Sequence, residues 1–226
     1  MIRSETNTIQ PPPLANGDHL TWEEFETRCE ADPDIKRAEL INGVVYMSPV
    51  SYISGQMEYL VLRWIGHYVD ATPGCETLAN TTFLMAGDAP QPDAFLRIRE
   101  DYGGQSKVLG KYLTGAPELV AEVCLTTAAY DLNEKLSLYA RAGVKEYITV
   151  LLHEREVLWH VHSGGGFSLL ALPADRIYRS TVFPGLWLDV EALFGERFKD
   201  VLATLNAGMA TEPYKQFAEA LSRKSH

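Results

Sequence analysis

The chain has 226 residues and a formal net charge of −10, with 46% hydrophobic and 22% charged residues. This length allows one substantial hydrophobic core, and the composition is ordinary for a globular protein. Dedicated sequence-specific DNA-binding proteins are usually basic, so the acidic balance argues against tight standing binding to nucleic acid. It does not exclude a metal-dependent enzyme, because carboxylate ligands add negative charge to the metal-free chain.

The N-terminal residues 1–18 contain Pro11-Pro12-Pro13 and lack the apolar core of a secretory signal, so we interpret them as a disordered arm. We expect residues 19–226 to form a single domain, without a membrane span, because no apolar run approaches about 20 residues. The cysteines are odd in number and lack CxxC spacing, which favours a reducing compartment and therefore the cytoplasm.

The first predicted elements are a short helix, a hairpin and a long helix. Thr21 and Glu24 form a capping box, which predicts a helix start. Asn42-Gly43 separates two apolar runs and predicts a hairpin turn. Apolar residues then recur at helical spacing from Ile53 to about Asp70, which predicts a long amphipathic helix.

The rest of the chain predicts strands that alternate with helices. "CETLANTTFLM" and "DAFLRI" are typical of short strands, and helices are expected from about Glu191 onwards. Residues 118–152 have the pattern strand, helix, strand, with Gly143 at the helix end. This βαβ-like unit predicts an α/β fold with a partly parallel sheet.

Glu122 stands in the middle of a sequence typical of a buried strand, Leu119 to Leu125. An ionised carboxylate there costs several kcal/mol unless it is compensated. A divalent cation is one remedy, and Asp93, which begins a strand after Pro92, is the candidate for a second carboxylate ligand. A positive side chain is also needed, and Lys135 of the following helix has a stem long enough to return toward the sheet.

Each of these residues also has a structural interpretation. Glu122 can pair with a neighbouring cation within the sheet, and Asp93 can simply form a turn after proline. Lys135 follows Asp131 by four residues, which is the spacing of an ordinary surface ion pair on a helix.

Other reactive side chains favour structural roles. His160 and His162 share a strand face, but their position before a glycine run is typical of a solvated strand end rather than a metal site. Cys124 is interpreted as a small buried apolar residue, not a nucleophile.

Several segments resemble the Uma family of restriction endonucleases, which belongs to the PD-(D/E)XK nuclease superfamily. They are "AELINGVVYMSP", "QPDAF", "ELVAEV", "YDLNEKLSLYARAGVKEYITV" and "STVFPGLWLDVEAL". The resemblance extends from about Trp22 to about Gly208 and implies a restriction-endonuclease-like α/β fold, with a mixed central β-sheet flanked by helices. It also implies that Asp93 and Glu122 are metal ligands and that Lys135 is the motif's lysine, moved from the strand to the helix.

The same resemblance implies hydrolysis of phosphodiester bonds in nucleic acid, with DNA as the first expectation. Mg²⁺ or Mn²⁺ would be held by Asp93, Glu122 and the main-chain carbonyl of Val123. Glu39 matches a recurrent family acid, either as an accessory ligand or as a hydrogen-bonding partner. Because folds of this type often act in pairs, a homodimer is expected by analogy.

Two further features concern substrate and activity. The connection from Arg97 to Lys111 is locally basic, which predicts contacts to a nucleic-acid backbone from Arg97, Arg99, Lys107 and Lys111. Ser54 stands where the family often has a histidine. This difference and the acidic charge favour an alternative, a nuclease-fold binding or assembly module with weakened catalysis.

Overall fold

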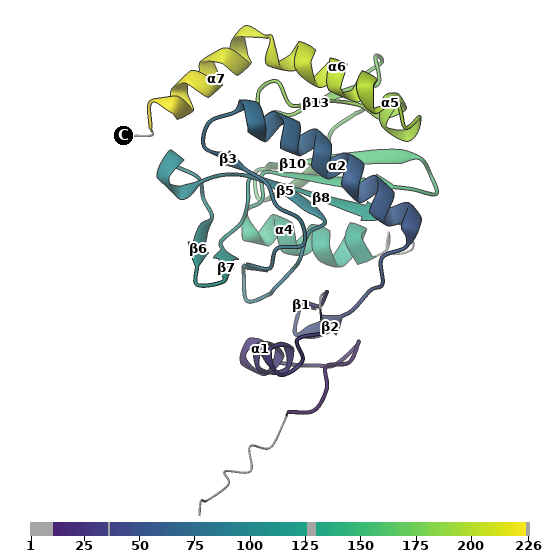
Figure 1. Cartoon of the computed structure of the whole chain (residues 1–226), viewed down its shortest axis with the longest axis vertical. Helices are drawn as coiled ribbons and strands as arrows, with labels where there is room; N and C mark the ends of the chain where they lie inside the picture. Colours follow the sequence, from purple (N-terminus) through teal and green to yellow (C-terminus); the bar gives the residue numbers. More distant parts are fainter. Residues whose placement is uncertain (1–10, 36, 126–129, 225–226) are drawn as a thin grey trace, which may run out of the picture.

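A six-stranded mixed sheet forms the centre of this computed structural model, which describes residues 11–35, 37–125 and 130–224 (Figure 1). The strand order is β11 (Gly166–Leu169), β10 (Glu156–Ser163), β9 (Glu146–Leu151), β8 (Leu119–Cys124), β5 (Ala94–Ile98) and β3 (Cys75–Glu76). β8 and β9 run parallel, and the other neighbours are antiparallel. The predicted βαβ unit is therefore confirmed.

Helices cover both faces of the sheet. α2 (Tyr52–Ala71) lies on one face with α5 (Val190–Phe194), α6 (Phe198–Met209) and α7 (Glu212–Ser222), and α4 (Leu136–Ala142) lies on the other (Figure 1). Side chains of β8 alternate between these layers, so that Ala121 belongs to the same cluster as Trp64 of α2, and Val120 to the same cluster as Tyr139 of α4. All six residues of β8 are buried.

Local signals of the sequence coincide with the observed element ends. The capping box of α1 (Trp22–Ala31) is present, with Thr21 and Glu24 as predicted. Asn42 and Gly43 both have positive φ and join β1 (Glu39–Ile41) to β2 (Val44–Tyr46) in an antiparallel hairpin. Gly143 ends α4 in the left-handed conformation, as expected.

The smaller elements lie around this core. They are β4 (Phe83–Leu84), β7 (Tyr112–Thr114) and β6 (Lys107–Leu109), which form a three-stranded sheet, the hairpin of β12 (Ile177–Arg179) and β13 (Trp187–Asp189), the 3₁₀ turn η1 (Glu100–Tyr102), and the π-helical turn η2 (Asp131–Lys135) that precedes α4. Within the described ranges no helix combines the length and apolarity that a membrane crossing requires.

The segment interpreted as a disordered arm is described from residue 11 onwards, and residues 1–10 lie outside the described part. Leu14 is buried, and the Gly17 amide donates a hydrogen bond of 2.8 Å to the Val45 carbonyl. Residues 14–18 therefore lie against the β1–β2 hairpin, which extends the packed part of the chain toward the N-terminus.

Candidate active site

The register of two antiparallel strands brings Asp93 to Glu122. Ala94 of β5 pairs with Ala121 of β8, so the next positions outward are Asp93 and Glu122. The Val123 amide donates to Asp93 Oδ2 at 2.8 Å, and the Asp93 amide lies 3.4 Å from Glu122 Oε2. Two carboxylates that are distant in sequence thus lie side by side where the strand pairing ends.

Lys135 joins these two carboxylates from η2, on the face of the sheet that α4 covers. Its Nζ lies 2.9 Å from Glu122 Oε1 and 3.0 Å from Glu39 Oε1, and its side chain is only 5% exposed. Tyr139, one helical turn further along, donates its hydroxyl to the same Glu122 oxygen at 2.8 Å. The buried charge of Glu122 is therefore compensated by an ammonium group and a phenol.

The predicted surface pair of Lys135 with Asp131 is not tested, because the side chain of Asp131 lies outside the described part. What the structure describes is a buried Lys135 directed at two carboxylates. η2 is a π-helical turn, a local widening of the helix that is often found at functional sites.

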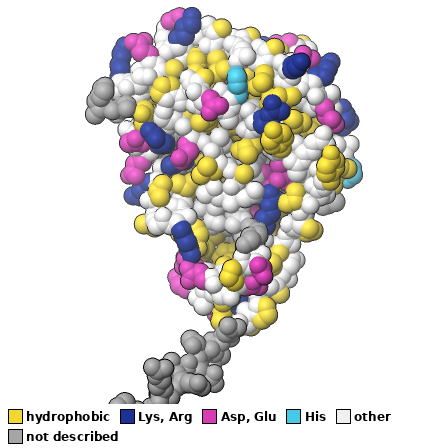
Figure 2. Space-filling model, viewed as in Figure 1, with side chains coloured by type: hydrophobic (Ala, Val, Ile, Leu, Met, Phe, Trp, Pro, Cys, Tyr) yellow, Lys and Arg dark blue, Asp and Glu magenta, His cyan; other side chains and the backbone are white. Residues whose placement is uncertain are grey.

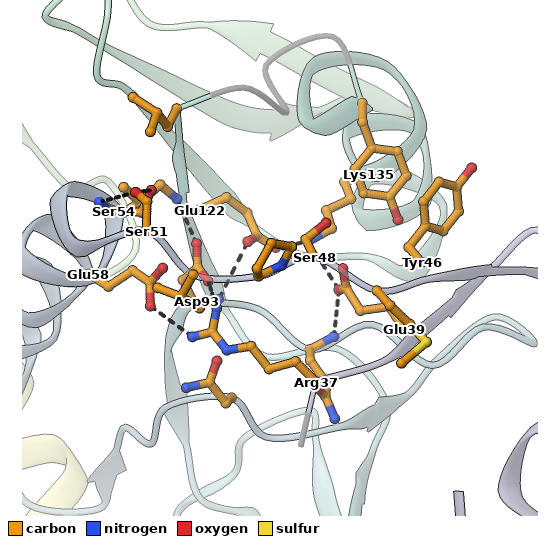
Figure 3. A pocket seen from close by; sticks show the side chains of 18 of the residues that line it. Arg37, Glu39, Tyr46, Ser48, Ser51, Ser54, Glu58, Asp93, Glu122 and Lys135 are labelled. Atoms are coloured by element: carbon orange, nitrogen blue, oxygen red, sulfur yellow. Dashed lines mark hydrogen bonds and ion pairs between the residues drawn. The ribbon is translucent and has the colours of Figure 1, made fainter. Parts of the chain in front are cut away.

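A cavity of about 500 Å³ is lined by Glu39, Asp93, Glu122 and Lys135, among other residues (Figure 3). Its charged lining consists of four carboxylates, Glu39, Glu58, Asp93 and Glu122, and two cations, Arg37 and Lys135. Arg37 and Lys135 lie on different sides of the carboxylates (Figure 3). One guanidinium nitrogen of Arg37 lies 2.8 Å from Glu58 Oε2, and another lies 3.8 Å from Asp93 Oδ1. The described lining carries more negative than positive charge.

The electrostatics of the cavity favour a cation. Burial, followed by the charge of Glu58, raises the pKa of Asp93 to about 6, although Lys135, the Val123 amide and Arg37 act in the opposite direction. Burial and the charge of Glu122 also raise the pKa of Tyr139 well above its usual value. Burial disfavours charge of either sign, whereas the contributions of Glu58 and Glu122 oppose further negative charge and favour positive charge.

Asp93 and Glu122 fit a hard divalent cation, because carboxylate oxygens are the ligands that Mg²⁺ prefers and Mg²⁺ often takes only one or two of them, with water at its other positions. Among the described residues, no group of three or more His, Cys, Asp or Glu side chains is arranged to hold a metal ion. Coordination would therefore depend on the two carboxylates, main-chain oxygen and water. Val123 also lines the cavity.

Glu39 and Ser54 both line the cavity. Glu39 Oε1 accepts a hydrogen bond from the Gln91 amide at 2.8 Å and contacts Lys135, so it links the β1–β2 hairpin to the site. Ser54 is buried in the first turn of α2, with its hydroxyl 2.9 Å from that of Ser51.

The basic residues predicted to contact nucleic acid lie outside the cavity lining. Arg97 is buried, with its Nε 2.6 Å from Glu76 Oε2 and another nitrogen 3.1 Å from the Ser106 carbonyl. Arg99 pairs with Asp101 at 3.3 Å. The remaining two are the exposed residues Lys107 and Lys111, the latter paired with Glu30.

His160 and His162 also lie away from the cavity lining. The His160 ring stacks on Tyr147 with centroids 6.2 Å apart, and His162 Nε2 lies 3.2 Å from the Ala140 carbonyl. Cys124 is buried and forms no disulfide.

Three contributors to the site were not predicted from the sequence: Arg37, Glu58 and Tyr139. Glu58 follows Ser54 by four residues on the inward face of α2, which was an available signal. Tyr139 lies one helical turn after Lys135, and a buried tyrosine hydroxyl needs a hydrogen-bonding partner, which was a second available signal. No local pattern distinguishes Arg37 from other surface arginines.

Comparisons with known proteins concern the family and the fold. The sequence matches the Uma2 family, described as putative restriction endonuclease, over residues 22–191. No curated protein matches the chain. Among solved structures it is similar to a putative nuclease belonging to DUF820 from Anabaena variabilis ATCC 29413, with 13% identity, a TM-score of 0.62, and coverage of 78% of this chain and 98% of that one. At this identity the likeness establishes the fold, and the family match establishes that the chain belongs to the Uma2 family.

Proposed function

We propose that this protein is a divalent-metal-dependent endonuclease that hydrolyses phosphodiester bonds in nucleic acid, with DNA as the preferred substrate. The observation that carries the proposal is the meeting of Asp93, Glu122 and Lys135 at one cavity, from two strands and a helical turn. Membership of a family described as restriction endonucleases supports it.

The roles of the residues follow from their contacts. Asp93, Glu122 and the Val123 carbonyl would hold Mg²⁺ or Mn²⁺, which lowers the pKa of water and offsets the charge of a phosphate. Lys135, which contacts Glu122 and Glu39, would orient the attacking water or stabilise negative charge on the phosphate in the transition state. Tyr139 keeps the Glu122 carboxylate in position.

The charge of the cavity predicts that substrate binding depends on a divalent cation. A phosphate that approaches four carboxylates and two cations meets net repulsion. On the face seen in Figure 2, basic and acidic side chains are interspersed, so the visible described surface offers scattered cations rather than a continuous basic stripe. We therefore expect nucleic-acid binding to be lost when a chelator removes divalent ions.

A binding or assembly module with weakened catalysis is the second candidate. Ser54, hydrogen-bonded to Ser51, occupies the cavity wall where the family often has a histidine. A cytoplasmic homodimer is part of the leading proposal by analogy with paired nucleases.

The test is a panel of labelled single-stranded and duplex DNA and RNA, incubated with Mg²⁺ or Mn²⁺. Asp93→Asn should abolish cleavage and weaken Mn²⁺ binding in calorimetry. Asp88→Asn is a matched control, because Asp88 is also buried, pairs with Arg141 and lies outside the cavity lining. Equal cleavage by wild type and Asp93→Asn contradicts the nuclease, and absence of Mn²⁺ binding at millimolar concentration favours the module.

A further inference from the structure

The two cations of the cavity, Lys135 and Arg37, differ in exposure and in their distances to the metal-site carboxylates. Lys135 is 5% exposed and lies within 3.0 Å of two carboxylates. Arg37 is 29% exposed, and its 3.8 Å distance to Asp93 Oδ1 exceeds hydrogen-bond length. The contact between Arg37 and Asp93 is therefore easier to break than the contacts of Lys135 with Glu122 and Glu39.

Arg37 and a divalent cation would occupy the same side of Asp93. Asp93 Oδ2 accepts the Val123 amide, and Arg37 faces the other oxygen, Oδ1. A cation bound to Asp93 would repel the guanidinium, since like charges at such short range in a partly buried site repel strongly. Binding of the ion therefore disfavours the contact between Arg37 and Asp93.

Glu58 keeps a displaced Arg37 close to the site. Its Oε2 lies 2.8 Å from a guanidinium nitrogen, and Glu58 projects from the long helix α2 (Figure 3). This contact uses one end of the guanidinium and leaves its other donors for a new acceptor. The planar guanidinium matches the geometry of a phosphate and can bind it through two hydrogen bonds.

We propose that Arg37 exchanges partners: it neutralises Asp93 in the cation-free cavity and contacts a substrate phosphate when a divalent cation is bound. The inference rests on the proposed function and adds a substrate-phosphate contact to it. A purely structural Arg37 would support both metal and nucleic-acid binding, whereas partner exchange requires effects of opposite sign.

The first measurement is Mn²⁺ binding by calorimetry, without nucleic acid. Arg37→Ala should bind Mn²⁺ about 3- to 10-fold more tightly than wild type, because a competing positive charge is removed. Arg37→Gln keeps a donor for Glu58 without the charge and should show the same direction. Arg37→Gln thus tests the same prediction if Arg37→Ala fails to fold. Thermal unfolding should show that each variant is folded.

The second measurement is binding of labelled DNA in Ca²⁺, followed by fluorescence anisotropy over a range of salt concentrations. Arg37→Ala should weaken DNA binding about 5- to 20-fold and reduce the slope of log affinity against log salt by about one. Arg28→Ala is the matched control, since Arg28 pairs with Asp18 at 2.9 Å, is similarly shielded and lies outside the cavity lining. It should change neither quantity.

Weaker Mn²⁺ binding in both Arg37 variants, or an unchanged salt slope, would overturn the exchange. If the nuclease proposal holds but this inference fails, wild type binds Mn²⁺ and Asp93→Asn does not, while the Arg37 variants behave like wild type. If wild type binds no Mn²⁺, both fail together.

Discussion

Two buried glutamates stand on neighbouring strands and have different surroundings. Glu146 of β9 accepts hydrogen bonds from the Ser180 hydroxyl at 2.6 Å, and from the amide and hydroxyl of Thr181 at 2.6 and 2.7 Å. Glu122 of β8 is compensated instead by Lys135 and Tyr139. Both residues are at most 2% exposed, so burial alone does not distinguish them.

The two glutamates differ in the kind of group that pairs with them. Neutral donors from one short segment hold Glu146 and fasten residues 180–181 to the sheet, although burial still raises the pKa of its carboxyl. Glu122 shares its cavity with three other carboxylates, and one of its two partners, Lys135, carries a positive charge. A buried acid indicates a functional site when its neighbours are charged and a cavity adjoins it.

The largest expected effect separates the two glutamates directly. Glu122→Gln should lower cleavage by about 1000-fold or more, because it removes a proposed metal ligand. Glu146→Gln should instead lower the free energy of unfolding by about 1–3 kcal/mol and leave the activity of the folded fraction unchanged. Cleavage assays and urea unfolding measure both. Equal losses of activity would contradict the distinction.

Removal of Lys135 should lower the free energy of unfolding, because the buried charge of Glu122 then lacks its cation. Lys135→Met should destabilise the metal-free protein by about 3 kcal/mol, since it leaves a buried carboxylate without its cation. The double variant Glu122→Gln/Lys135→Met should regain most of that stability in urea unfolding. Additive losses would mean that the two side chains do not interact.

Asp93 should weaken the cation-free fold at neutral pH. Folding raises its pKa from 3.8 to about 6, so the folded protein binds the proton more tightly and this group's contribution falls as pH rises through that interval. Asp93→Asn should therefore be more stable than wild type by about 1–2 kcal/mol above pH 6. The difference should shrink toward about pH 4 in urea unfolding with a chelator present. A difference that is independent of pH would refute this origin.

The smallest effect concerns the phenol that holds Glu122. Tyr139→Phe removes one hydrogen bond and should cost about 1 kcal/mol of stability, with a modest loss of cleavage. Tyr147→Phe is a control from the same apolar cluster. If Tyr139→Phe is as inactive as Glu122→Gln, the phenol has a direct role in the reaction.

Much of the fold was predictable because its signals are local. The capping box at Thr21, the turn at Asn42-Gly43 and the helix end at Gly143 each depend on a few adjacent residues, and each was confirmed. The basic connection shows the limit of this reasoning. Sequence reveals the charge of Arg97 but not its burial against Glu76, which depends on strand pairing.

The site was predictable in part. A carboxylate within an apolar strand and the resemblance to a nuclease family pointed to Asp93, Glu122 and Lys135. Arg37 and Glu58 were not predicted. They come close to Asp93 only when the segment before β1 and the helix α2 pack near the same strand ends.

The amino-acid sequence by itself determined the order of the elements, the buried position of Glu122 and the family, because periodicity, turn residues and motifs act over short stretches. Tertiary structure alone decided which charges meet. The register of β5 and β8 sets Asp93 beside Glu122, and helical packing buries Lys135 against Glu122. Charge pairing acts through space over a few ångströms, so it becomes defined only when distant segments are brought together.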